Sequence, residues 1–378
     1  MRILVYEFAS GGGLAGRAVP ASLAREGAAM RTALVRDLVA MKSHQLATTA
    51  DRRIVHHLPS SVAVTILPDG ARSREATLDR LIESVDAVWL IAPESDRCLE
   101  RLAARVECRG KRLLGSSADA IARASDKARL PACLAAAGVA HPTTRVLGPR
   151  DTDLSRAAVD FEYPIVVKPA RGAGSHGVGL AANARALDRA VSTARRADSS
   201  GVVLLQRFIR GRAASVSLLA NDCDVVPLAL NTQELRSVPP FSYRGGVTPY
   251  DHRLAPAARA AAVAACRALP GLRGFVGVDL VLAGRDVFVI EVNPRLTTAY
   301  LGVRAAFDEN VGALALAACE GALPDRLRPQ RRVGFSASGR VVVRASTVGA
   351  TRVKAGTNSP EPGPFAEADG FTVPVEPR

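Results

Sequence analysis

The sequence predicts an α/β chain in which an open parallel sheet comes first and two α+β subdomains follow. Two observations support this fold class. The chain opens with a strand, a glycine-rich loop and a helix, the first unit of an open parallel sheet, whereas further along short strands follow one another with fewer helices between them. With 378 residues, 48% of them hydrophobic, the chain is long enough for two or three separate cores.

The first domain is expected to span residues 1–115. Its expected elements, in chain order, are a strand at 2–6, a helix at about 20–40, a strand near 62–67, a helix near 75–84, a strand near 87–92 and a helix near 94–106. Pro93-Glu94-Ser95 follows the last of these strands. Because open sheets place ligand-contacting loops at the carboxyl ends of their strands, this tripeptide is expected near a ligand.

The loop after the first strand carries Ser10 and three glycines, Gly11, Gly12 and Gly13. Glycines let the backbone approach a ligand closely, and their N–H groups can form a nest for an anion such as a carboxylate. These four residues are therefore candidate substrate contacts. The spacing is not G-x-G-x-x-G, which argues against a dinucleotide site. The alternative is a flexible turn at the edge of the sheet.

The second domain is expected to span residues 116–322, with a smaller lid subdomain at about 140–210. A β extension at 323–354 and a mobile tail at 355–378 are expected to follow. The expected elements, in chain order, are a helix capped by Ser125 and ending near 137, a strand at 163–169, a helix at 183–195, strands at 202–209, 214–219 and 225–230, helices at 254–269 and 310–320, and a hairpin at about 332–344. Segment 238–249, rich in proline, glycine and aromatic residues, is expected to form a loop over a pocket.

Lys168 ends the strand at 163–169 and precedes a loop of small residues. That loop consists of Gly172, Ala173, Gly174, Ser175, His176 and Gly177. Loop N–H groups can wrap phosphate oxygens while a lysine ammonium supplies a point charge, so this arrangement is typical of a phosphate-covering loop. Only five of the 50 basic residues are lysine, which suggests that lysine is required where it occurs.

A candidate metal site lies where the apolar run Val287–Ile290 gives way to Glu291, Asn293 and Arg295. Residues two apart on a strand project from the same face, so Glu291 and Asn293 can share a cation. A three-residue turn at 284–286 would place Asp279 of the preceding strand opposite Glu291. Such hard oxygen ligands suit Mg²⁺, with Mn²⁺ as a substitute. The alternative is that both acids are rim carboxylates paired with arginines.

Composition limits the function classes. The formal charge is +14, but the arginines are spread along the chain without a dense basic run, which argues against specific nucleic-acid binding. The longest apolar runs are shorter than the ~18–20 residues needed to cross a membrane, and the start of the chain lacks a signal-peptide pattern, so a cytoplasmic protein without a membrane partner is expected. The six cysteines are scattered without a C-x-x-C pair, which favours neither zinc nor disulfides.

Taken together, these motifs resemble those of the ATP-grasp superfamily. The motifs that agree in order and spacing are Ser125-Asp126-Lys127, Val166-Val167-Lys168-Pro169, Gly172–Gly177, Gln206-Arg207-Phe208-Ile209, Asp279 and Glu291-Val292-Asn293-Pro294-Arg295. The resemblance covers about residues 115–320, and the first domain matches the pre-ATP-grasp unit. It implies a fold in which two α+β subdomains clamp ATP.

The resemblance also implies roles for individual residues. Lys127 and Lys168 would contact the ATP phosphates and the adenine edge, and the loop 172–177 would close over the phosphates. The hinge formed by Gln206, Arg207, Phe208 and Ile209 would pair with adenine. Asp279, Glu291 and Asn293 would hold Mg²⁺, while Arg295, together with Lys168, would stabilise the charge of the transferring phosphoryl group. Ala213 stands where the family's ribose-binding glutamate would fall, so ribose must be contacted by another group.

A narrower resemblance points to the tyramine–glutamate ligase group of methanofuran-type cofactor synthesis. It rests on Glu7–Gly13, Glu26-Gly27-Ala28-Ala29-Met30 and Tyr243–Pro249. It implies an amide bond between a glutamate side-chain carboxylate and a tyramine- or tyrosine-like amine, formed through an acyl phosphate, with Arg244, Gly245 and Gly246 as further candidate substrate contacts. A homodimer is one expected assembly. The alternatives are an ATP-grasp ligase with other substrates and a nucleotide-binding regulatory protein without turnover.

Overall fold

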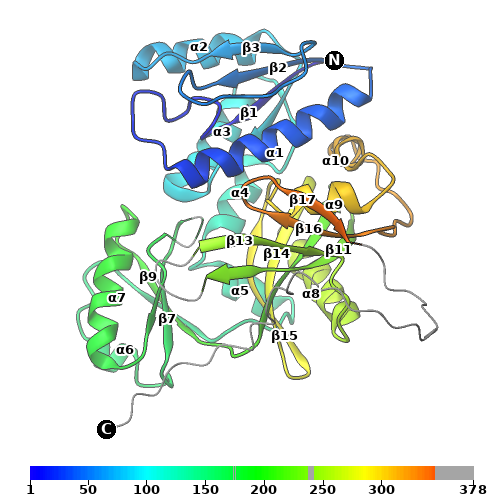
Figure 1. Ribbon diagram of the computed structural model, residues 1–378. Coiled ribbons are helices and arrows are strands. Elements are labelled where there is room, and N and C mark those ends of the chain that lie inside the picture. The colour runs from blue at the N-terminus through cyan, green and yellow to red at the C-terminus, as the bar shows by residue number, and fades with distance from the viewer. Residues whose placement is uncertain (173, 175, 237–241, 345–378) are drawn as a thin grey trace, which may run out of the picture.

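The computed structural model describes residues 1–172, 174, 176–236 and 242–344, and four sheets organise these residues. Figure 1 shows three lobes: the N-terminal sheet at the top, a lid at the lower left and a larger lobe around strand β14. The predicted combination of a parallel N-terminal sheet with later α+β units is confirmed. The expected tail at 355–378 lies outside the described residues.

The N-terminal sheet is parallel, with strand order β3-β2-β1-β4-β5. Its elements are β1 (Arg2–Glu7), α1 (Ala21–Ala40), β2 (Gln45–Ala50), β3 (Ala63–Ile66), α2 (Ala71–Glu83), β4 (Ala87–Ile91), a 3₁₀ turn η1 (Ser95–Arg97), α3 (Cys98–Glu107) and β5 (Arg112–Leu113). The sequence did not predict β2, because its residues are QLATTA rather than an apolar run. Buried Thr48 in this strand satisfies its hydroxyl by donating to the Val5 carbonyl at 2.6 Å.

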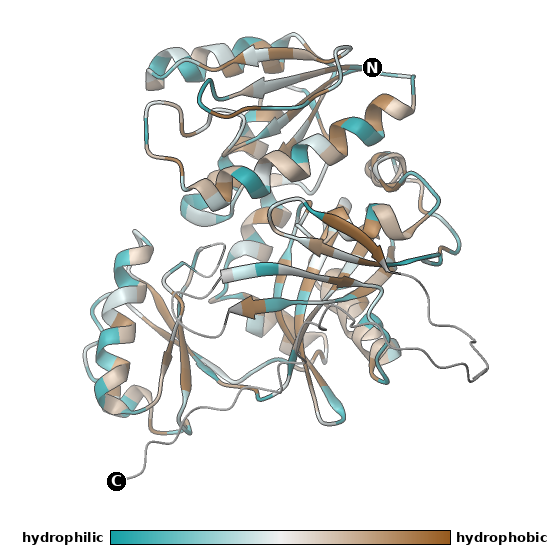
Figure 2. Cartoon of the chain, viewed as in Figure 1, coloured by the Kyte–Doolittle hydropathy of each residue, from teal (hydrophilic) through white to brown (hydrophobic). Residues whose placement is uncertain are grey.

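The lid is a four-stranded sheet of order β6-β9-β7-β8. Its elements are β6 (Thr144–Leu147), α6 (Leu154–Ala157), β7 (Ile165–Pro169), β8 (Gly179–Ala181), α7 (Ala184–Ala197) and β9 (Val203–Arg207). The side chain of Asn183 caps α7 by accepting from the Ala186 N–H at 3.0 Å. Leu187 and Val191 bury the inner face of α7 against the strands, which appear brown in Figure 2 beside a mostly teal and white helix.

The central sheet is antiparallel, with order β11-β10-β14-β15. Its elements are β10 (Arg212–Ala220), β11 (Val225–Thr232), β14 (Gly274–Ala283) and β15 (Asp286–Asn293), and helix α8 (Ala255–Arg267) covers one face. Two helices follow, α9 (Tyr300–Ala306) and α10 (Val311–Cys319). They pack with α1 in one core, so the central lobe and the N-terminal lobe share buried apolar surface.

A smaller sheet of order β12-β13-β16-β17 completes the described part of the chain. It contains β12 (Glu234–Arg236), β13 (Ser242–Thr248), β16 (Arg332–Ser336) and β17 (Val341–Arg344). The predicted hairpin at 332–344 is confirmed. The predicted loop at 238–249 is wrong over β13, because this segment pairs with both β12 and β16. Residues 237–241 lie outside the described ranges.

Ser125 does not cap a helix, which corrects the sequence prediction. It is the last residue of α4 (Ala118–Ser125), and α5 (Leu130–Ala136) begins only after Asp126 has turned the backbone out of the helix. The cap of α4 is Ser117, whose side chain accepts from the Ala120 N–H at 3.2 Å. The break between the two helices leaves Lys127 on a short connection rather than inside a regular helix.

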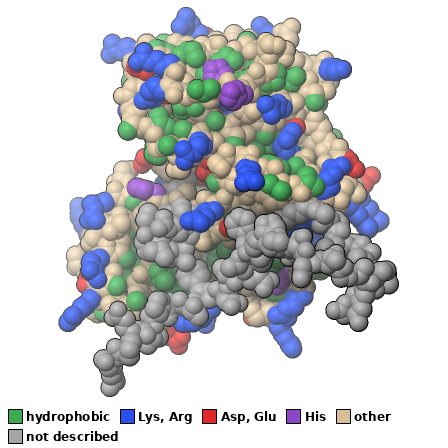
Figure 3. Space-filling model, in the orientation of Figure 1, with side chains coloured by type: hydrophobic (Ala, Val, Ile, Leu, Met, Phe, Trp, Pro, Cys, Tyr) green, Lys and Arg blue, Asp and Glu red, His purple; other side chains and the backbone are tan. Residues whose placement is uncertain are grey.

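On the face shown in Figure 3, lysine and arginine side chains are scattered and do not gather into one basic patch. Within the described ranges, no helix combines the length and apolar character needed to span a bilayer.

Candidate active site

β14 and β15 carry the candidate metal ligands and bring Asp279 opposite Glu291 as predicted, but the turn between the two strands differs from the prediction. The hairpin turn between β14 and β15 has two residues, because Ala283 pairs with Asp286. That register alone would place Asp279 opposite Ile290. A β-bulge between Asp279 and Leu280 shifts the pairing by one residue, so that Asp279 lies opposite Glu291. The predicted three-residue turn is therefore wrong, whereas the predicted pairing is confirmed.

Asp279 is held by two amide side chains. Gln233 donates to its Oδ1 at 2.7 Å, and Asn293 donates to its Oδ2 at 3.2 Å. Burial raises the pKa of Asp279 to about 7, and the negative charge of Glu291 adds to this shift. Gln233 was not found from the sequence. It follows β11, and its N–H donates to the carbonyl of Ala213 at 3.2 Å, so it lies beside the position that lacks the ribose-binding glutamate.

Glu291, on β15, forms an ion pair with Lys127. The Lys127 Nζ lies 2.9 Å from Glu291 Oε1 and also donates to the Gly172 carbonyl at 2.8 Å. Burial alone would raise the pKa of Glu291, but Lys127 and Lys168 outweigh it and hold that pKa below its ordinary value. Three segments far apart in the sequence thus meet at the Lys127 ammonium: the connection after α4, the start of the loop after β7, and the end of β15.

Lys168 is buried at the end of β7 in the lid sheet. Burial lowers the pKa of Lys168 to about 8; Glu291 and Asp279 oppose this shift, whereas Lys127 adds to it. The side chain is still mainly protonated at neutral pH. Two lysines and two carboxylates therefore face one another where the lid meets the central sheet, a charge arrangement suited to a polyanion bound with a cation.

The donor set of Asp279, Glu291 and Asn293 fits a hard divalent cation. The two carboxylates repel each other, since each raises the electrostatic cost of ionising its neighbour, and a cation between them would remove that repulsion. Few protein ligands leave coordination positions for phosphate oxygens, which favours Mg²⁺. Asn293 presently turns its amide nitrogen toward Asp279. Its oxygen would have to face a bound cation, so the amide must rotate.

The predicted adenine hinge lies at the end of β9, an inner strand of the lid sheet. Gln206 is buried, and its side chain donates to the Thr144 hydroxyl at 2.9 Å. The N–H of Arg207 donates to the Thr143 carbonyl at 2.9 Å, while the Arg207 side chain is exposed. Phe208 and Ile209 are half-buried. The start of the hinge is therefore held on both sides, by β6 and by β7.

The loop after β7 begins in a charged network. Arg171 lies 3.5 Å from Glu100 of α3 and 3.4 Å from Asp126, and its N–H donates to Asp198 at 3.0 Å. Gly174 and Gly177 have positive φ angles of 63° and 74°, which other residues adopt rarely. His176 is exposed. Ala173 and Ser175, both predicted phosphate contacts, lie outside the described residues.

Arg295 is bound by an acid from the N-terminal sheet. Its Nε and Nη2 donate to the two carboxylate oxygens of Glu94 at 2.7 and 2.8 Å, and its Nη1 donates to the Leu296 carbonyl at 3.1 Å. Burial would lower the pKa of Arg295, but the Glu94 charge outweighs it and raises that pKa. The loop after β4, expected near a ligand, thus reaches the candidate site through Glu94.

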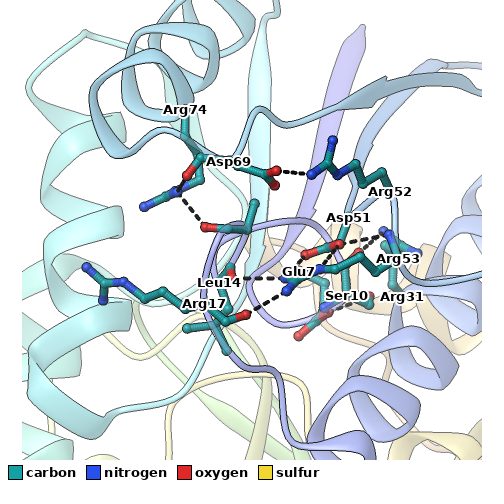
Figure 4. Close-up of polar contacts among 11 residues, drawn as sticks. Glu7, Ser10, Leu14, Arg17, Arg31, Asp51, Arg52, Arg53, Asp69 and Arg74 are labelled. Carbon is teal, nitrogen blue, oxygen red and sulfur yellow. Dashed lines mark hydrogen bonds and ion pairs between the residues drawn. The ribbon is translucent and has the colours of Figure 1, made fainter.

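The start of the N-terminal glycine loop already contacts a carboxyl group of the chain itself. The buried carboxylate of Glu7 accepts from the N–H groups of Ala9 and Ser10 at 2.9 and 2.5 Å, and also from the Ser10 hydroxyl. Arg31 donates to the carbonyls of Ser10 and Thr49. Figure 4 shows Glu7, Ser10 and Arg31 from this group. The N–H groups of Ala9 and Ser10 therefore face Glu7 rather than a substrate.

Arginines from the segment after β2 and from helix α2 fix the rest of this loop. Arg53 donates to the carbonyls of Arg17 and Leu14 at 2.7 and 3.0 Å and pairs with buried Asp51, as Figure 4 shows. Arg74 donates to the Ala15 carbonyl at 2.9 Å. A Cβ on Gly11 would lie 2.0 Å from the Glu7 carbonyl oxygen. These contacts give Gly11 a packing role; the predicted substrate contacts of Ser10–Gly13 stay a prediction.

Close packing explains why two positions of β13 are glycine. A Cβ on Gly245 would lie 2.0 Å from the Phe335 carbonyl oxygen, and one on Gly246 would lie 2.0 Å from the Thr232 carbonyl oxygen. Arg244, which lies between Tyr243 and Gly245, is exposed. Burial raises the pKa of Tyr243, and the negative charges of Asp279, Glu26 and Glu234 add to this shift.

Comparisons with known proteins agree with this geometry. The sequence pattern of the pre ATP-grasp 3 domain matches residues 44–121, and that of the ATP-grasp domain matches residues 124–299. A D-alanine–D-alanine ligase from Anaeromyxobacter is 30% identical over a 260-residue match that covers 63% of this chain and 79% of that ligase. The chain belongs to the ATP-grasp superfamily. An ATP-grasp superfamily protein from Archaeoglobus fulgidus has a similar structure, with a TM-score of 0.65 and 26% identity over 89% of this chain and 92% of that chain.

Another relative of this ATP-grasp chain is more similar over a shorter stretch. The tyramine–L-glutamate ligase of Methanocaldococcus fervens is 36% identical over 101 residues, which are 27% of this chain. The match spans 33% of the length of that ligase. An L-amino acid ligase from Bacillus licheniformis shares the fold, with a TM-score of 0.64 and 17% identity over 88% of this chain and 78% of that chain.

Proposed function

We propose that the chain is an ATP-dependent, ADP-forming carboxylate–amine ligase. The observation that carries the proposal is the meeting of Lys127 and Lys168 with Asp279, Glu291 and Asn293 where the lid sheet faces the central sheet. This set can bind a polyphosphate and a cation at the same place. Superfamily membership and the similarity to two kinds of ligase support the proposal.

The reaction would run in two steps. A carboxylate oxygen of the first substrate attacks the γ-phosphorus of ATP, the bond to the bridging oxygen breaks, and ADP leaves. The nitrogen of an amine then attacks the acyl carbon, phosphate leaves, and the nitrogen loses a proton. Such phosphoryl transfer depends on positioning and charge stabilisation more than on covalent help from the protein.

The chain's own residues supply those effects. Lys127 and Lys168 place positive charge beside the phosphates, and the loop after β7 would cover them and exclude water that hydrolyses an acyl phosphate. Mg²⁺ held by Asp279, Glu291 and Asn293 would supply further neutralisation of phosphate charge. Arg295, beyond Asn293 on the same segment, would face the phosphoryl group in transfer. Residues 1–115 would act as the pre-ATP-grasp domain and 116–322 as the ATP-grasp domain.

For the substrates, we favour the side-chain carboxylate of glutamate and a tyramine-like amine, as in methanofuran-type cofactor synthesis. The support is the similarity to tyramine–L-glutamate ligases. A second candidate is an amino-acid or peptide ligase, since the D-alanine–D-alanine ligase comparison covers more of the chain.

A coupled assay of ADP release tests both candidate functions. The purified protein is incubated with Mg²⁺-ATP and glutamate, with and without tyramine or tyrosine, and in parallel with pairs of amino acids. We expect ADP only when glutamate and the amine are both present. ADP with two amino acids alone would favour the second candidate, and no ADP with any pair would contradict the ligase assignment.

A further inference from the structure

The ion pair between Arg295 and Glu94 joins parts of the chain that are 201 residues apart. It is bidentate, at 2.7 and 2.8 Å, and its side chains are 16% and 1% exposed, respectively. Two parallel N–H to oxygen bonds fix the plane of a guanidinium group, which a single bond would leave free to turn. The orientation of Arg295 is therefore set by a residue of the N-terminal sheet.

Glu94 itself sits in a tight loop. The Pro93 carbonyl accepts from the Leu99 N–H at 3.0 Å, and the Glu94 carbonyl accepts from the Arg97 N–H at 3.2 Å. Asp96 and Arg97 have φ angles of 50° and 57°, a conformation uncommon for residues other than glycine. These hydrogen bonds hold the Glu94 backbone in a turn, from which its side chain reaches Arg295.

The surroundings leave Arg295 little room to move away from the pair. The adjoining cavity is only about 20 Å³ and has mainly apolar walls, including Leu90, Leu114 and Leu296. That volume holds about one water molecule. Contacts with the described residues use three of the five N–H groups of the guanidinium, which leaves one on Nη1 and one on Nη2 for a ligand.

We infer that Glu94 is a positioning residue that holds Arg295 in place for phosphoryl transfer, so that the N-terminal sheet contributes to the chemistry of the ATP-grasp part. This inference rests on the proposed function. Arg295 follows Asn293 by two residues, so the guanidinium lies just beyond the candidate metal ligands. Glu94 touches no reacting atom and acts only through Arg295.

A double-mutant cycle tests this inference. The variants are Glu94→Ala, Arg295→Ala and the double variant, each assayed for kcat and for KM with ATP. We expect Glu94→Ala to lower kcat about 10- to 100-fold with little change in KM, as removal of a supporting contact commonly does. The double variant should be no slower than Arg295→Ala alone, because Glu94 has no role once Arg295 is gone.

Asp37→Ala provides the matched control. Asp37 forms a bidentate pair with Arg304, at 2.9 and 2.5 Å, that also joins the N-terminal lobe to the segment after β15. We expect this control to lower thermal stability and leave kcat unchanged. An unchanged or raised kcat in Glu94→Ala, or additive losses in the double variant, would overturn the inference.

A second readout separates this inference from the proposed function. If the wild-type protein releases no ADP with any substrate, the ligase proposal fails, and binding of aluminium fluoride in the presence of Mg²⁺-ADP decides the inference. Glu94→Ala and Arg295→Ala should both weaken aluminium fluoride binding while Mg²⁺-ADP affinity stays unchanged. Equal aluminium fluoride affinities in Glu94→Ala and wild type, or no binding of Mg²⁺-ADP by wild type, would overturn it.

Discussion

Replacing Glu291 by glutamine tests the charge balance of the candidate site. The change keeps the shape of the side chain but removes the negative charge that lies 2.9 Å from Lys127. It also removes one proposed ligand of Mg²⁺. Stability and activity should therefore respond by different amounts.

The expected loss of stability is modest. Removing one partner of a buried ion pair costs about 3–5 kcal/mol when the other charge is left alone. Here the side chains of Lys127 and Glu291 are 8% and 21% exposed, so the pair is nearly buried. Glutamine still offers Lys127 an oxygen, however, and it no longer repels Asp279. We therefore expect the free energy of unfolding to fall by about 1–3 kcal/mol, less than full loss of a buried pair.

The expected loss of activity is larger. A charge-stabilising group in an enclosed site commonly contributes a factor of about 10²–10³ to kcat. We expect Glu291→Gln to lose at least that much and to need more Mg²⁺ for its residual activity. Urea unfolding followed by circular dichroism gives the stability, and ADP release over a Mg²⁺ titration gives the activity.

Glu320→Gln is the control for this pair of measurements. Glu320 lies 3.0 Å from Arg112, but the side chains of Arg112 and Glu320 are 56% and 40% exposed. Exposed pairs contribute little, about 0–1 kcal/mol, so both stability and activity should be close to wild type. Wild-type ADP release and an unchanged Mg²⁺ requirement in Glu291→Gln would refute the reasoning.

Three further changes give distinct results. Lys168→Met should abolish ADP release yet raise the free energy of unfolding by up to about 3 kcal/mol, because burial disfavours the charged lysine, and urea unfolding would show it. Burial raises the pKa of Glu7, so the contribution of Glu7 to stability is greatest at low pH and declines as the pH rises above 4.5 toward the folded-state pKa. Glu7→Gln should therefore reduce the difference between the free energies of unfolding measured at pH 5 and at pH 7. Gly246→Ala should lower the unfolding temperature strongly, since its Cβ would overlap the Thr232 carbonyl, whereas exposed Arg244→Ala should not.

Features that depend on local spacing were predicted well from the sequence. Two apolar runs joined by a short turn predicted that Asp279 and Glu291 lie opposite each other on β14 and β15, and the apolar run before Lys168 marked β7. Even there the turn was misjudged, because the two-residue turn and the bulge give the same pairing as a three-residue turn. Sequence alone does not distinguish these two solutions.

Features that depend on contacts between distant segments were not predicted. Gln233 reaches Asp279 across 46 residues, and Glu94 reaches Arg295 across 201. No periodicity connects such positions. The glycine loop shows the converse case: its pattern suggested an anion nest, but the pattern did not reveal that Glu7, at the end of the preceding strand, occupies the N–H groups of Ala9 and Ser10.

The central claim is that this site activates a carboxylate with ATP, and oxygen-isotope transfer tests it most directly. The carboxylate substrate is labelled with ¹⁸O, turnover is started with Mg²⁺-ATP and the amine, and the released phosphate is analysed by mass spectrometry. The account predicts one ¹⁸O atom in each phosphate, because the acyl oxygen leaves with it. Unlabelled phosphate during amide formation would contradict an acyl-phosphate ligase.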